Sequence, residues 1–134
     1  MRLWHKDLIP VLPRQQLLSQ WRECCCIAKN ISVNGKPNHL LVNKVLDYPI
    51  NHLVTYGWLV YMEMINREYN VDFYKFGHYF TYPHETKLIN HKEDLFRGWH
   101  TDRYLTQCYY NLQEKYDCGG ISVEEWNKVH DFFK

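Results

Sequence analysis

Side chains that could hold a metal ion are plentiful in this sequence, but their spacing does not bring them together. The chain has eight His and five Cys, of which three are consecutive at positions 24–26. No CxxC or HxxxH pair occurs, whereas a metal site needs ligands that converge on one point. An odd number of cysteines with an adjacent triplet also makes a poor disulfide framework. We therefore expect no metal, no cofactor and reduced, mostly buried thiols, with a metal-binding helical domain kept as an alternative.

The pair Arg22-Glu23 is the other candidate for chemistry, and it stands in a stretch with helical periodicity. Apolar residues recur at spacings of four, three and four, which marks the buried seam of a helix: Leu17, Trp21, Cys24 and Ala28. At about 100° per residue, Glu23 lies away from that seam, on the same flank as Gln16, Ser19 and Gln20. A carboxylate in such a place is ordinarily solvated, and it becomes catalytic only if a reacting group lies beside it.

The element that must position this pair is a helix preceded by a proline-containing arm. Pro10 and Pro13 predict an extended arm that leads into a helix beginning near Pro13, because proline is tolerated in a first helical turn. The helix should fade by Asn30. The following Val33-Asn34-Gly35-Lys36-Pro37 has the chemistry of a turn.

The rest of the chain also reads as helical, so the predicted fold class is all-α. A short helix is expected over 39–47 and a central one over 51–69. Residues 70–98 predict only short helical turns and loops. Thr101 is a good N-cap for a helix that stops at Gly119-Gly120, and Ser122 with Glu125 forms a capping-box signature before a terminal helix.

Length and composition fit one domain spanning residues 1–134. The chain is 46% hydrophobic with 6 Gly and 5 Pro, which allows a substantial core. The first residues lack the apolar core of a secretory signal, and no apolar run is long enough to span a bilayer, so we expect a cytoplasmic protein without membrane contact. The net charge is only +1, yet residues 1–44 hold seven basic and two acidic side chains. That asymmetry favours an N-terminal third that faces an anion, although solvated surface lysines give similar numbers.

The first helix also carries a family resemblance. The string Gln15-Gln16-Leu17 followed by Trp21-Arg22-Glu23 resembles the signature of the pyrimidine-dimer DNA glycosylases of the endonuclease V type. The segment Val33-Asn34-Gly35-Lys36 is similar to the family's Asn-Gly-Lys turn, and residues 100–115 resemble its late helix. The likeness is spread over most of the chain, and it is weak between residues 70 and 98.

The resemblance implies a compact helical domain whose N-terminal arm packs between helices and brings the α-amine beside Glu23. An α-amine has a pKa of about 7.7–8.0, so part of it is neutral and nucleophilic at cellular pH. By this likeness Met1 supplies the nucleophile and Glu23 the catalytic carboxylate. The DNA contacts carried over are Arg2, Gln16, Arg22, Asn34 and Lys36.

The expected activity is therefore a DNA glycosylase with associated abasic-site lyase activity, acting on damaged double-stranded DNA without an obligate protein partner. The lesion could be a cyclobutane pyrimidine dimer, another damaged base or an abasic site. Arg2 after Met1 blocks Met removal, so Met1 stands where the phage enzymes have a processed Thr; Gln16 replaces a family His and Cys26 a family Arg. A non-enzymatic helical DNA-binding or interaction module of the same fold is the competing hypothesis.

Overall fold

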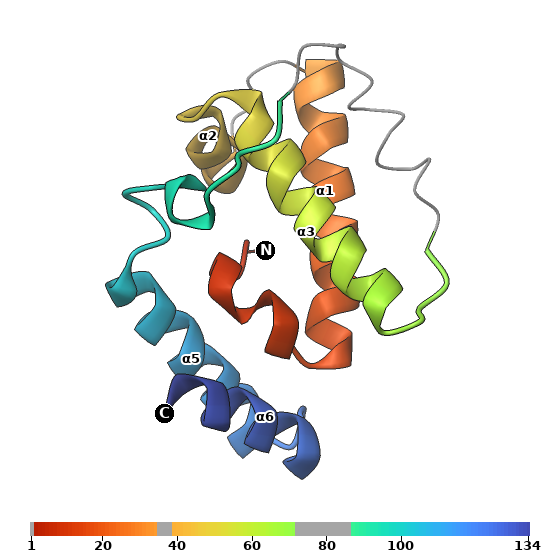
Figure 1. Cartoon of the computed structure of the whole chain (residues 1–134), viewed down its shortest axis with the longest axis vertical. Coiled ribbons are helices and arrows are strands. Elements are labelled where there is room, and N and C mark those ends of the chain that lie inside the picture. The colour runs from red at the N-terminus through yellow and green to blue at the C-terminus, as the bar shows by residue number, and fades with distance from the viewer. Residues whose placement is uncertain (1, 35–38, 72–86) are drawn as a thin grey trace.

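The computed structural model describes residues 2–34, 39–71 and 87–134, and it leaves the side chain of Asn34 undescribed. In these ranges the chain forms only helices, as predicted. Their order is η1 (Lys6–Val11), α1 (Arg14–Asn34), α2 (Leu40–Leu46), α3 (Ile50–Asn66), η2 (Lys92–Asp94), α5 (Asp102–Asp117) and α6 (Val123–Phe133), where η denotes a 3-10 helix. Figure 1 shows α1 and α3 on one side, α5 and α6 on the other, and the N-terminal segment between them.

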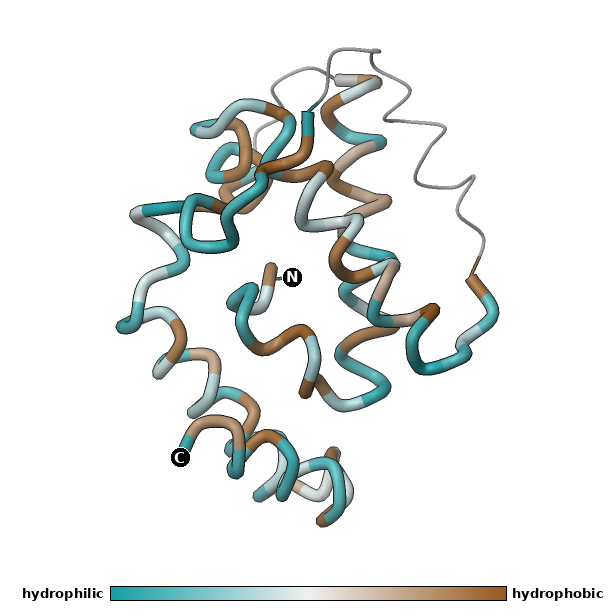
Figure 2. The backbone as a smooth tube through the Cα atoms, viewed as in Figure 1, coloured by the Kyte–Doolittle hydropathy of each residue, from teal (hydrophilic) through white to brown (hydrophobic). Residues whose placement is uncertain are grey.

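The N-terminal arm is buried among these helices. Leu3, Leu8 and Leu12 are at most 1% exposed, and η1 packs against both α3 and α6. Hydrophobic and hydrophilic residues alternate along the larger helices, as Figure 2 shows, so each helix has an apolar side to turn towards this segment. The expected placement of the arm between helices is confirmed.

The arm is not extended up to Pro13 as predicted, because residues 6–11 form η1. The His5 side chain accepts a hydrogen bond from the Asp7 amide at 3.0 Å and caps the first turn. Pro10 inside η1 is compatible with the φ of a 3-10 helix. At the C-terminal end of η1, the Arg67 guanidinium donates to the carbonyls of Pro10 and Leu12. These carbonyls therefore have hydrogen-bond donors although the helix does not continue.

Helix α1 begins where predicted, directly after Pro13, but it ends at Asn34 rather than near Asn30. Its apolar seam continues past the predicted end, since Ile31 packs against the core. No residue that breaks a helix occurs before Gly35. The predicted turn therefore loses Val33 and Asn34 to the helix, and its remaining members lie outside the described residues.

The helix boundaries of the C-terminal part follow the predicted capping signals. Thr101 Oγ1 accepts a hydrogen bond from the Tyr104 amide, and Ser122 Oγ accepts one from the Glu125 amide. Gly119 adopts a φ of +85° after α5, a conformation that glycine reaches without strain. The central helix α3 ends at Asn66, three residues earlier than predicted, and Glu68 follows with a φ of +62°. In the described ranges, none of the helices combines the length and apolar character needed to cross a bilayer.

Candidate active site

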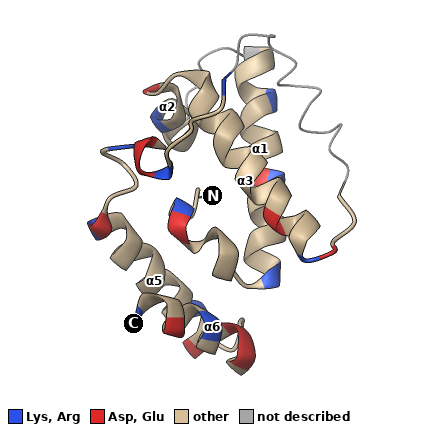
Figure 3. Ribbon diagram, viewed as in Figure 1, with Lys and Arg blue, Asp and Glu red and all other residues tan. Residues whose placement is uncertain are grey.

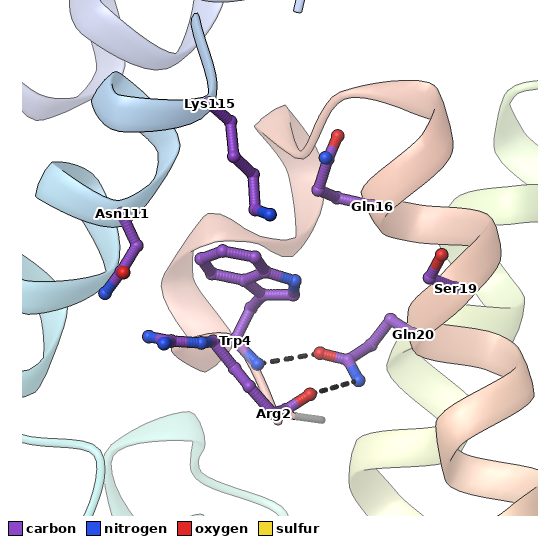
Figure 4. Close-up of a pocket in the computed structure, with 7 residues that line it drawn as sticks. All are labelled: Arg2, Trp4, Gln16, Ser19, Gln20, Asn111 and Lys115. Atoms are coloured by element: carbon purple, nitrogen blue, oxygen red, sulfur yellow. Dashed lines mark hydrogen bonds between the residues drawn. The ribbon is translucent and has the colours of Figure 1, made fainter. Parts of the chain in front are cut away.

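The polar flank of α1 predicted from helical spacing exists, but part of it is buried. Gln20, which shares this flank with Glu23, is only 1% exposed. The reason is that the N-terminal arm lies on it: the Gln20 amide donates to the Arg2 carbonyl at 2.9 Å and accepts from the Trp4 amide at 2.7 Å (Figure 4). This pair of bonds joins the arm to the helix that carries Glu23.

A pocket of about 310 Å³ opens beside this junction, and we call it the arm pocket. Its lining comes from the arm, α1 and α5: Arg2, Trp4, Gln16, Ser19, Gln20, Asn111 and Lys115. Figure 4 shows Arg2, Lys115 and Gln16 projecting around the indole ring of Trp4. The Arg2 guanidinium lies over that ring, 5.1 Å from its centroid, in a cation–π contact.

The charge in the arm pocket is positive. Arg2 and Lys115 contribute two cations, and the other lining side chains are uncharged. Asn111 and Gln16 add amide groups that can donate or accept hydrogen bonds, whereas the amide of Gln20 is already bonded to the arm. Such a lining suits an anion with polar substituents, such as the phosphate and sugar of a nucleotide.

Glu23 continues the α1 face that lines the arm pocket. It follows Gln20 by three residues, which places it about 4.5 Å further along the helix axis on the same side. Its Oε2 is buried and has no hydrogen-bond partner among the residues that the structure describes. Because burying an unpaired carboxylate oxygen costs free energy, this oxygen would accept a hydrogen bond from a donor that reaches it.

Arg22 lies at the edge of the arm pocket rather than inside it. Its side chain is exposed, and Nη2 donates to Ser19 Oγ at 3.2 Å. It also lines a neighbouring groove of about 480 Å³, together with Trp21 and Cys26 among others. The guanidinium is therefore free to contact an anion that approaches α1 from solvent.

The structure brings together some of the predicted site residues and leaves others apart. Arg2 and Gln16 line the arm pocket, and Arg22 and Glu23 adjoin it. Asn34 ends α1, twelve residues and about 18 Å along the axis from Arg22, so its backbone is remote from the pocket. Met1 and Lys36 lie outside the described residues.

Sequence reasoning missed three residues of the arm pocket. Trp4 was not singled out, and Asn111 and Lys115 belong to α5, a hundred residues away in the chain. A signal did exist for the last two, since residues four apart share one face of a helix and both are polar. Nothing in the sequence, however, indicated that this face would meet the arm.

A set of buried histidines lies on the other side of the arm. The Lys6 amide donates to His100 Nδ1 at 3.0 Å, and the rings of His5 and His100 stack with centroids 5.2 Å apart. Burial, with the nearby His5 and Lys6 adding to it, lowers the pKa of His100 to about 2. His100 is thus neutral, as its acceptor role at Nδ1 requires. Across the described ranges, no three His, Cys, Asp or Glu side chains gather in a way that could hold a metal ion.

The five cysteines carry free thiols in the structure. Cys24 and Cys108 are buried and Cys25 is half-buried, but Cys26 and Cys118 are exposed, so the expectation of mostly buried thiols is only partly met. Burial raises the pKa of both buried thiols, which makes them poor nucleophiles.

Comparison with known proteins identifies the family. The model of the pyrimidine dimer DNA glycosylase family matches residues 1–75, which include the arm, α1, α2 and α3. Neither a curated protein nor a solved structure gives a significant match. The matched part contains Arg2, Gln16, Arg22 and Glu23, whereas Asn111 and Lys115 of α5 lie beyond it. With more than half of its residues matched, the chain belongs to the pyrimidine dimer DNA glycosylase family.

Proposed function

We propose that this protein is a DNA repair glycosylase with abasic-site lyase activity, in which the α-amine of Met1 is the nucleophile and Glu23 the catalytic carboxylate. The observation that carries the proposal is Oε2 of Glu23, which is buried without a hydrogen-bond partner among the described residues and lies one helical turn beyond Gln20 of the cationic arm pocket. Family membership supports damaged DNA as the substrate.

In the proposed reaction, the neutral amine attacks C1′ of the damaged nucleotide as the glycosidic bond breaks. The base leaves with the bonding electron pair, and opening of the sugar ring gives a cationic imine. The Glu23 carboxylate stabilises that cation and removes a proton from C2′. The electron pair left on C2′ expels the 3′ phosphate by β-elimination, and water then hydrolyses the imine and releases the amine.

The arm pocket offers groups to hold the strand during these steps. In this proposal Arg2 and Lys115, which line the pocket, contact phosphates, and Arg22 contacts another from the edge of the pocket. Gln16 and Asn111 can bond to an extruded nucleotide. Extrusion costs a few kcal/mol and is easiest where damage has already weakened pairing or stacking, which contributes to selectivity.

The test is reductive trapping with borohydride. A duplex with one abasic site, one with a cyclobutane pyrimidine dimer and an undamaged duplex are incubated with the protein and reductant. We expect a covalent adduct with the first two duplexes and blocked N-terminal sequencing of that adduct. An absence of adduct with every duplex would refute the proposal, and an adduct through a lysine would refute the role of Met1.

A further inference from the structure

Three successive carbonyl groups of the N-terminal arm are each held by a side chain from a different helix. Gln20 of α1 donates to Arg2 O, Tyr104 of α5 donates to Leu3 O at 2.6 Å, and Tyr56 of α3 donates to Trp4 O at 2.6 Å. Burial raises the pKa of both tyrosines, so their hydroxyl groups stay protonated and able to donate.

Gln20 differs from the two tyrosines because it binds the arm at two points. Its amide pairs with the Arg2 carbonyl and the Trp4 amide, as the peptide group of a neighbouring β-strand would. Rotating the amide by 180° would oppose donor to donor and acceptor to acceptor, so the two bonds fix its orientation. Tyr56 Oη also lies 2.9 Å from Gln20 Oε1, so its one proton is shared between that oxygen and the Trp4 carbonyl.

The contact of Gln20 with Arg2 lies at the end of the arm where apolar packing stops. Leu3 and Trp4 are anchored by burial, at 0% and 7% exposure, but Arg2 is half-buried at the mouth of the pocket. The core would hold the arm from Leu3 onward without Gln20. The bond to the Arg2 carbonyl instead restrains the peptide between Arg2 and Leu3, at the end of the arm that carries Met1.

We propose that Gln20 is a positioning residue that fixes Arg2, the residue next to the proposed nucleophile Met1, relative to Glu23 on the same helix. This inference rests on the proposed function. Gln20 and Glu23 are one turn apart on a rigid α1, so the helix transmits the position of the arm to the carboxylate. Because a displacement of about 1 Å between reacting groups can lower a rate roughly 100-fold, the restraint acts on the reaction rather than on DNA affinity.

The experiment compares Gln20→Met with wild type in single-turnover trapping on abasic-site DNA. Methionine has a similar length and no amide, so the core is filled while the bonds to the arm are lost. We expect trapping to slow by roughly 10- to 100-fold, with the Kd for the duplex changed less than about threefold. Gln113→Met on α5, a half-buried glutamine outside the arm pocket, is the matched control and should behave as wild type.

Gln20→Glu gives a readout that a purely structural role would not move. In Gln20→Glu the ionised carboxylate still accepts a hydrogen bond from the Trp4 amide, but its second oxygen faces the Arg2 carbonyl and repels it. The protonated acid has an O–H group that can donate to the Arg2 carbonyl again. The trapping rate of Gln20→Glu, divided by the wild-type rate at each pH, should therefore rise as the pH falls through the pKa of the introduced acid. Cyanoborohydride is the reductant here because it survives acidic solution.

NMR measures the arm itself, independently of activity. In wild type, the Arg2 and Leu3 amides should show rigid backbone order, and the Trp4 amide should exchange slowly with solvent. In Gln20→Met the backbone order of Arg2 and Leu3 and the slow exchange of the Trp4 amide should both be lost. In Tyr104→Phe, which removes the hydrogen bond to Leu3 O but keeps the ring in the core, both should be weakened.

The outcomes separate this inference from the function on which it rests. Slower trapping at unchanged Kd, with a loosened arm, supports the role of Gln20. An active wild type with an equally active Gln20→Met, or a loss confined to Kd, overturns that role and leaves the proposed function intact. A wild type that traps no duplex overturns the proposed function, and the contact of Gln20 with the arm is then structural only.

Discussion

At the scale of single residues, one carboxylate oxygen of Glu23 is buried and has no hydrogen-bond partner in the part of the chain that the structure describes. Replacing a carboxylate by a neutral amide of the same shape removes the buried charge, so Glu23→Gln should fold at least as stably as wild type. It should keep imine trapping and DNA binding but lose strand cleavage by roughly 10²- to 10⁴-fold, the usual contribution of a general base. Gel assays of nicked product would measure this, together with thermal unfolding.

The control for Glu23 is Glu124→Gln on the exposed surface of α6, which should cleave at the wild-type rate. Equal cleavage by Glu23→Gln and wild type would remove Glu23 from the mechanism. A variant that neither binds nor traps DNA would show that the carboxylate serves the fold and not the reaction.

His100 makes stability depend on pH. Its pKa is lowered to about 2 in the folded protein, mainly by burial, against an ordinary value of 6.5. Below pH 6.5 the unfolded chain therefore binds a proton at His100 that the folded protein does not bind. The free energy of unfolding is highest above pH 6.5 and decreases as the pH falls below that value. His5 and His52, whose pKa values are also lowered by burial, act in the same direction.

The expected loss from His100 alone is about 2 kcal/mol of unfolding free energy between pH 7 and pH 5. Urea unfolding at several pH values in that window measures it, because carboxylates titrate mostly below pH 5. A free energy of unfolding that stays flat from pH 7 to 5 would show that His100 is protonated in the folded protein.

The positions of the site residues were predictable only where helical spacing determined which side of a helix they occupy. The spacing put Glu23, Gln16 and Gln20 on one flank of α1, and the structure agrees. The spacing did not predict that Gln20 is buried, because the neighbours that cover it come from the arm, about 16 positions earlier. Periodicity reports which residues share a side of a helix, and it contains no information on what covers that side.

At the scale of elements, the start of α1 is tied to α6 by one carboxylate. Glu125 Oε2 accepts a hydrogen bond from the Arg14 amide at 2.7 Å, and Ser122 Oγ donates to Oε1 at 3.1 Å. Burial acts to raise the pKa of Glu125, but these hydrogen bonds outweigh it and lower the pKa overall. The carboxylate thus satisfies an amide that the first turn of α1 leaves without a helical partner.

Glu125→Ala should destabilise the protein by about 1–2 kcal/mol, the cost of losing a hydrogen bond from a backbone amide to a charged acceptor. Glu124→Ala, one residue earlier and exposed, is the matched control and should change stability by less than about 0.5 kcal/mol. Urea unfolding at pH 7 gives both values. Equal effects of the two substitutions would mean that the link between α6 and α1 contributes nothing.

Three helix boundaries were predicted correctly because a residue that starts or ends a helix stands there in the sequence. Pro13, Thr101 and Gly119 each mark a boundary that the structure confirms, because each acts through local backbone chemistry. The end of α1 and the presence of η1 were missed, because tertiary contacts decide them. Packing of Ile31 extends α1, and Arg67, far along the chain, accommodates the carbonyl groups of η1.

At the scale of the whole molecule, the near-neutral net charge conceals an uneven distribution. Figure 3 shows basic residues along α1 and acidic ones on α6, and the sequences of these helices agree: α1 has three basic residues and one acidic, α6 three acidic and one basic. The arm pocket adds Lys115 from α5 to this basic side. The charge asymmetry between the two ends of the chain could be predicted from the sequence. The contribution of Lys115 could not, because it depends on how α5 packs beside the arm.

DNA binding should therefore be moderately salt-dependent. If Arg2, Arg22 and Lys115 each neutralise one phosphate, the logarithm of the association constant falls with a slope near −2.7 against the logarithm of salt concentration, or roughly 40-fold in affinity between 50 and 200 mM. Lys115→Ala should reduce the slope by about 0.9, whereas the control Lys128→Ala on the exposed side of α6 should leave it unchanged. Fluorescence anisotropy with an abasic-site duplex measures both. Identical slopes for the two variants would mean that Lys115 does not contact a phosphate and that the DNA does not bind at the arm pocket.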